Sequence, residues 1–218
     1  MTGSAQGFLI TTPHDDDAIA YCNAWSKEIM DAASQKGFLV FELPGAKANK
    51  SDFESYLNKQ NIRFVMFNGH GAPDLITGYK KEVILQAGKN DNLLKGKVAY
   101  ARSCYSLSIL GESCITAGAD GFVGYKLPFM FVSDPTRGAH PLKDELAKPC
   151  FVTSNIIPIS MLKGHTVCET VQKAKTEIQK MIDYWETRSD LVEAPMVAAC
   201  LYWNGSGLDY CGNGDTKL

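Results

Sequence analysis

The chain has 218 residues, of which 45% are hydrophobic and 21% charged, a composition typical of a folded globular protein rather than of a disordered or membrane-spanning chain. Its 22 Lys and Arg residues nearly balance its 24 Asp and Glu residues. No strong electrostatic field therefore attracts nucleic acid or an anionic membrane, and we expect neither as a partner. A chain of this length buries a core without disulfides or metal, so we expect one domain over residues 1–218.

The first apolar run, residues 8–10, lacks the basic flank and the length of a signal sequence. No apolar stretch is long enough to span a bilayer, so we predict a cytoplasmic protein. The seven cysteines are odd in number and include no Cys-x-x-Cys pair, which argues against a disulfide framework and against a zinc site. We expect reduced core cysteines, no metal and no cofactor.

The first half of the chain alternates apolar runs with helical patterns. Helical spacing of apolar residues over 18–32, followed by Gly37, predicts a first helix. Ser51 and Glu54 form a possible capping box for a second, short helix. Continuous apolar runs predict buried strands over residues 8–12, 38–43, 62–67, 97–101 and 121–125.

The second half contains the longest predicted helix. A helix is predicted over 109–117, and a loop rich in Pro, Gly and Asp over 128–141. Thr166 and Glu169 form a capping box before an amphipathic helix whose apolar stripe runs from Val167 to Trp185. The apolar residues over 197–203 predict a further element, either a helix or a strand.

This alternation of strand and helix predicts an α/β fold: a three-layer α/β/α sandwich around a mostly parallel sheet with right-handed crossovers. In such folds ligands bind beyond the carboxyl ends of the strands. The unusual residues of this chain follow the first, third and fourth predicted strands.

Two of these strands end in reactive side chains. The third strand runs into Asn68-Gly69-His70-Gly71, and the fourth into Arg102-Ser103-Cys104. If the two strands are neighbours, as consecutive strands often are, His70 and Cys104 lie side by side at one sheet edge. A thiol needs a base or a positive environment to become a nucleophile at neutral pH, and His70 supplies either.

Backbone groups near the pair suit an acyl-transfer reaction. The N–H groups of Gly71 and Cys104 are candidates to stabilise the oxyanion, and a helix starting just after Cys104 would add positive partial charge at the sulfur.

An apolar strand ending in His-Gly, followed by a second strand ending in a small residue and Cys, resembles the caspase–gingipain–separase group of cysteine peptidases, clan CD. The segment Gly118–Tyr125 and the endings Leu201-Tyr202-Trp203 and Gly214–Leu218 resemble the corresponding parts of gingipain-type and CHAT-type members. The chain departs from the pattern at Ser103, where Ala is commoner. It also lacks the Pro of the Gly-Asp-Pro-x-Leu ending, since Thr216 follows Asp215.

The resemblance implies a caspase-haemoglobinase-like fold and a cysteine endopeptidase that acts on protein or peptide substrates through a thioester, with His70 and Cys104 as its dyad. It also implies that Arg102, Ser103 and the loop after the first strand line the pocket for the substrate side chain before the scissile bond. The residues of that loop are His14, Asp15, Asp16 and Asp17.

The signs of these pocket residues conflict. Arg102 favours an acidic substrate side chain, whereas the three aspartates favour Lys or Arg. Alternatively, Arg102 pairs with one of the aspartates while another caps the first helix.

Two other functions compete with the peptidase. A catalytically silent regulatory or protein-binding module keeps the fold without the reaction, and a regulatory partner or homo-oligomer remains possible for either function. Acidic residues after the first strand and Lys126 after the fifth suggest a phosphoacceptor receiver domain, but Asn68 stands where that family places its Asp.

Overall fold

The computed structural model describes residues 5–218. The six strands of the main sheet are β1 (Gly7–Thr12), β2 (Leu39–Pro44), β3 (Ile62–Asn68), β7 (Val98–Arg102), β8 (Gly121–Tyr125) and β9 (Leu208–Gly212). They lie in the order β2-β1-β3-β7-β8-β9. All neighbouring pairs are parallel except β8 and β9. The five strands predicted from apolar runs are confirmed, as is the mostly parallel sheet.

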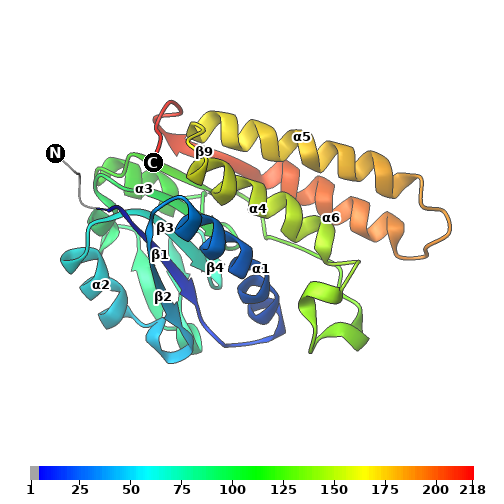
Figure 1. Cartoon of the computed structure of the whole chain (residues 1–218), viewed down its shortest axis with the longest axis horizontal. Coiled ribbons are helices and arrows are strands. Elements are labelled where there is room, and N and C mark those ends of the chain that lie inside the picture. The colour runs from blue at the N-terminus through cyan, green and yellow to red at the C-terminus, as the bar shows by residue number, and fades with distance from the viewer. Residues whose placement is uncertain (1–4) are drawn as a thin grey trace.

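Helices cover both faces of this sheet (Figure 1). They are α1 (Asp17–Gln35), α4 (Lys148–Leu162), α5 (Val167–Glu186) and α6 (Ala194–Gly207) on one face, and α2 (Lys50–Lys59) and α3 (Leu110–Thr116) on the other. Alternation along β3 explains the two layers, because Phe64 and Met66 join the first core whereas Val65 and Phe67 join the second. The predicted three-layer α/β/α class is thus confirmed.

One helix and four strands described below had no counterpart in the sequence-based prediction. Helix α4 contains Pro158 and is almost entirely buried, so it shows no amphipathic pattern. Strand β9 lies in the Gly-rich tail and depends on antiparallel pairing with β8. Between β3 and β7, where a loop was expected, lies a small antiparallel sheet of β4 (Gly71–Ala72), β5 (Leu75–Thr77) and β6 (Val83–Gln86).

The predicted helix starts were partly wrong. Helix α2 is capped by the side chain of Asn49, which accepts from the Asp52 N–H, rather than by Ser51. Helix α3 begins at Leu110, after a series of turns, so it does not start just after Cys104. The capping box of α5 is confirmed, since Thr166 and Glu169 bond each other's backbone N–H groups.

All seven cysteines are free thiols, and five of them are buried, as expected for reduced core residues. No helix within residues 5–218 is long and apolar enough to cross a membrane.

The capping box of α5 gives a direct test of the fold. We expect Thr166→Ala to lower the free energy of unfolding by about 1 kcal/mol, because an N–H of the first turn loses its acceptor. Urea unfolding measures the change. Thr176→Ala, at an exposed position inside the same helix, serves as the control and is expected to change stability by less than about 0.5 kcal/mol.

Candidate active site

Strands β3 and β7 are neighbours, so their carboxyl ends meet at one edge of the sheet. Their parallel register pairs Asn68 with Arg102. Beyond the last paired residues, the Ser103 hydroxyl donates to the Gly69 carbonyl oxygen over 2.8 Å. Continuing the register by two residues brings His70 opposite Cys104.

Gly71 brings the two backbones into contact just beyond this point. A Cβ atom on Gly71 would lie 3.1 Å from the Cys104 nitrogen and closer still to the Cys104 carbonyl oxygen. No residue with a side chain fits there without displacing the backbone of Cys104. The segment that follows His70 therefore packs directly on the residue that carries the thiol.

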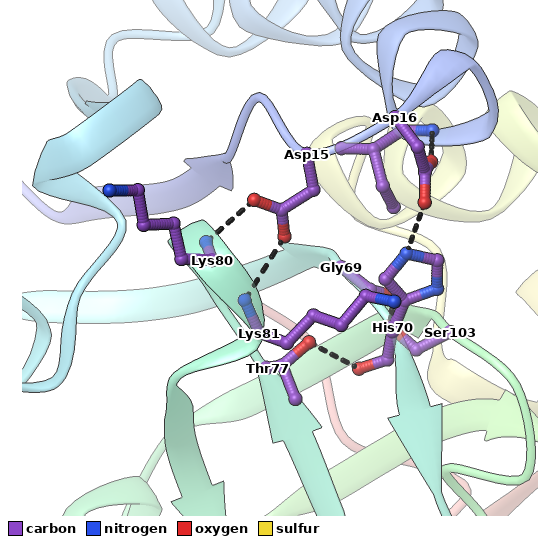
Figure 2. Close-up of polar contacts among 9 residues, drawn as sticks. Asp15, Asp16, Gly69, His70, Thr77, Lys80, Lys81 and Ser103 are labelled. Carbon is purple, nitrogen blue, oxygen red and sulfur yellow. Dashed lines mark hydrogen bonds and ion pairs between the residues drawn. The ribbon is translucent and has the colours of Figure 1, made fainter.

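Asp16 orients the His70 ring (Figure 2). His70 Nε2 lies 2.7 Å from Asp16 Oδ2. Because a carboxylate only accepts hydrogen bonds, Nε2 carries the proton in this pair and Nδ1 is left as the acceptor nitrogen. The His70 carbonyl oxygen accepts from the Thr77 N–H over 2.9 Å and from the Thr77 hydroxyl over 3.3 Å. Both the ring and the backbone of His70 are thus fixed.

Asp16 also caps α1. Its Oδ1 accepts from the Ile19 N–H over 3.1 Å. Burial alone would raise the pKa of Asp16, but the hydrogen bond from Ile19 and the contact with His70 outweigh it and lower the pKa. Asp16 is therefore ionised at neutral pH, and one carboxylate both starts the helix and positions the imidazole.

Cys104 is partly buried. Desolvation by burial raises the pKa of its thiol, while the backbone N–H of Phe129 lies close enough to the sulfur to oppose part of that shift. The resting thiol is therefore protonated at neutral pH, and its reaction requires a base. The next residue, Tyr105, has a φ of 57°, a strained value for an aromatic residue.

The other residues of the loop after β1 have different surroundings. Asp15 accepts from the backbone N–H groups of Lys80 and Lys81 at 2.6 and 3.4 Å (Figure 2). Those two lysines have positive φ values of 54° and 59°, so Asp15 stabilises a strained turn between β5 and β6. His14 is exposed and lies beside Gly45. Asp17 is exposed and, within residues 5–218, has neither an ion-pair nor a hydrogen-bond partner.

Arg102 is 1% exposed and lies beneath the sheet edge. Its Nη2 donates to the Ser26 hydroxyl over 3.4 Å, and its guanidinium carbon lies 5.5 Å from the centre of the Phe151 ring. Its Nε and Nη1 have no partner in the described part of the chain. The alternative that Arg102 pairs with an aspartate is therefore wrong. The same alternative expected another aspartate to cap the first helix, and Asp16 does so.

Sequence reasoning did not single out three residues that shape this site: Thr77, Tyr105 and Phe129. Phe129 lies in the predicted 128–141 loop. Thr77 and Tyr105 had no signal in the sequence, because a hydrogen bond to His70 and a positive φ both depend on the folded backbone.

No protein-family model matches the sequence, and no curated protein matches it. Among solved structures, the chain is similar to the Arg specific cysteine proteinase gingipain R, with a TM-score of 0.62 and 10% identity over 98% of this chain and 47% of that one. It is also similar to a complex of the Porphyromonas gingivalis RgpB pro- and mature domains, with a TM-score of 0.59, 9% identity and coverage of 98% and 48%. A structure described only as a protease gives a TM-score of 0.52 with 13% identity and coverage of 98% and 48%.

The chain thus spans about half the length of these proteins. It has a caspase- and gingipain-like α/β fold, and the fold predicted from the sequence resemblance is confirmed. At this level of identity, the comparison concerns the fold and not the activity.

The charge of Asp16 is testable through the pH dependence of stability. Asp16→Asn keeps an N-cap of equal quality but removes the charge. Because the pKa of Asp16 is lowered in the folded state, its contribution is present above the ordinary Asp value of about 3.9 and is lost as the pH falls through the folded-state value. Wild type is therefore expected to be more stable than Asp16→Asn at pH 7, and the difference should shrink in acid. Urea unfolding across this range measures it, and a difference that does not vary with pH would contradict the assignment.

Proposed function

We propose that the chain is a cysteine endopeptidase in which Cys104 is the nucleophile and His70 the proton-transfer residue. The observation that carries this proposal is the parallel pairing of β3 with β7, whose register, continued by two residues, sets His70 opposite Cys104. The hydrogen bond that Nε2 donates to Asp16 adds support, because it leaves Nδ1 of a neutral imidazole as the nitrogen available to take a proton. Oriented imidazole beside a thiol is the arrangement that nucleophilic acyl transfer requires.

In the first half of the reaction, the Cys104 sulfur attacks the carbonyl carbon of the scissile peptide bond while its proton passes to His70 Nδ1. The negative charge that develops on the carbonyl oxygen is stabilised by nearby backbone N–H groups, for which Gly71 and Cys104 are the candidates. Asp16 stabilises the imidazolium that forms. The imidazolium then protonates the departing amine, the C–N bond breaks, and a thioester remains on Cys104.

In the second half, water attacks the thioester carbonyl and gives up a proton to the neutral His70. Collapse of the second tetrahedral species breaks the C–S bond. The carboxylic acid product leaves, and the sulfur recovers its proton from the imidazolium. The raised pKa of the resting thiol is compatible with this sequence, because the proton is transferred during the attack rather than before it.

For specificity we propose that the side chain before the scissile bond is basic. Two of the three aspartates after β1 already have protein partners, whereas Asp17 has none within the described residues. Asp17 borders a groove of about 350 Å³. Phe129 lines this groove, and its backbone N–H approaches the Cys104 sulfur. The groove is lined by Asp17, Ala18, Tyr21, Phe129, Met130, Phe131 and Ser133.

A free carboxylate at the edge of a partly aromatic groove suits Lys or Arg, through an ion pair and cation–π contacts. Buried Arg102 does not border this groove. The proteinase gingipain R, to which the chain is similar in fold, is described as Arg specific, which supports the same choice.

The nucleophile is tested by Cys104→Ala. We expect this variant to lose peptide hydrolysis by at least about a thousandfold, because no other group forms the thioester, while its melting temperature stays nearly unchanged. Cys168→Ala, which removes another partly exposed thiol, is the matched control and should keep full activity. Equal hydrolysis by Cys104→Ala and wild type would reject the assignment, and no hydrolysis by either would favour the silent binding module.

The specificity is tested with acyloxymethyl ketones that place Arg, Lys, Asp or Leu beside the warhead. We expect the Arg and Lys reagents to label Cys104 fastest. Asp17→Asn should reduce their advantage over the Leu reagent about tenfold, as expected for one charge-assisted contact worth about 1.5 kcal/mol. Asp31→Asn, a variant of an exposed aspartate farther along α1, should leave the order and the ratios unchanged. Fastest labelling by the Asp reagent would contradict the basic preference.

A further inference from the structure

The segment 126–131 follows β8 and bonds alternately to two different parts of the molecule. Toward the loop that carries the thiol, the Leu127 carbonyl oxygen accepts from the Tyr105 N–H over 3.3 Å. Two residues later, the Phe129 N–H approaches the Cys104 sulfur. Residues 127 and 129 thus face the nucleophile, as alternate residues of an extended chain face one side.

Residues 128 and 130 face α6 instead. The Met130 N–H donates to Asn204 Oδ1 over 2.9 Å, and Asn204 Nδ2 donates to the Met130 carbonyl oxygen over 2.7 Å. The Trp203 indole N–H donates to the Pro128 carbonyl oxygen over 3.1 Å. Asn204 is 3% exposed, and its amide bonds this segment through both its oxygen and its nitrogen, while it also lies within hydrogen-bond reach of the Cys150 thiol.

We propose that Asn204 is a positioning residue that sets how closely the segment 126–131 covers Cys104. The amide fixes Met130 at both its N–H and its carbonyl oxygen, and Met130 follows directly on Phe129. The same segment supplies Phe129, Met130 and Phe131 to the groove beside Asp17. Its role in substrate binding rests on the proposed function, whereas its role in covering the thiol does not.

Loss of the amide has opposite effects on two kinds of reagent. When the segment withdraws, the thiol gains solvent and a small alkylating reagent reaches it more easily. A substrate-like reagent loses one wall of its groove and reacts more slowly. General loosening of the fold is distinguished from this effect, because it also exposes buried thiols that the segment does not cover, such as Cys114 in the core on the other face of the sheet.

The pH dependence of alkylation adds a second signature. Burial is the largest cause of the raised pKa of Cys104, and the Phe129 N–H opposes it. Withdrawal removes both effects, so the pKa falls toward the ordinary thiol value of about 8.5. The titratable group that interacts with the sulfur is Cys22 on α1, whose own pKa burial raises to about 11. His70 follows β3 at the same edge of the sheet. Neither group has a hydrogen bond with Asn204.

The experiment compares Asn204→Ala with wild type. Iodoacetamide and an Arg acyloxymethyl ketone are each timed on Cys104 by peptide mass spectrometry, with Cys114 monitored in the same samples. We expect the ratio of the ketone rate to the iodoacetamide rate to fall at least about tenfold, since small displacements near reacting atoms have effects of this size. The alkylation profile should shift to lower pH, with no gain in Cys114 labelling.

Trp203→Phe removes only the indole N–H and should change the ratio in the same direction by a smaller factor, so it tests the proposal even if Asn204→Ala does not fold. Ser206→Ala, at an exposed position on the same helix, should match wild type. Unchanged ratios in both variants, or Cys104 and Cys114 gaining reactivity together, would overturn the proposal. If the ketone fails to label wild-type Cys104, the peptidase proposal fails, while the iodoacetamide rates and their pH profile still test the role of Asn204.

Discussion

The parallel pairing of β3 with β7 is the constraint on which the site depends. It places the segments Gly69–Gly71 and Ser103–Cys104 side by side, and the absence of a side chain at Gly71 lets the two backbones touch. His70 and Cys104, 34 residues apart in the chain (104 − 70), therefore follow neighbouring strands at the same edge of the sheet. Both side chains belong to segments that continue from buried strands, so their positions derive from the rigid core.

Three consecutive aspartates after β1 have three separate roles. Asp15 stabilises a strained turn, Asp16 caps α1 and orients His70, and Asp17 remains available to a ligand. Arg102, whose charge suggested the opposite specificity, is buried beneath the sheet edge. The conflict in the sequence between acidic and basic substrates therefore arises because adjacent residues of like charge have different partners in the folded protein.

The surroundings of Cys104 come from distant parts of the chain. The segment after β8 covers the thiol, and α6, more than 70 residues further on, fixes that segment through Asn204. The covering segment both raises the pKa of the thiol by excluding water and opposes the rise through the Phe129 N–H. Reactivity at Cys104 is thus linked to packing on the far side of the segment.

Apolar runs and capping residues determined much of this protein without its tertiary structure. The five parallel strands, the helices after Asp16 and Thr166, and the sheet edge shared by His70 and Cys104 follow from local periodicity and from the adjacency of consecutive strands. Tertiary structure alone decided the formation of α4, β9 and the small sheet β4-β5-β6, the partners of Asp15 and Asp16, the burial of Arg102 and the cover over Cys104. These features depend on contacts between residues far apart in the chain, whose free energies outweigh local propensity and leave no periodic pattern in the sequence.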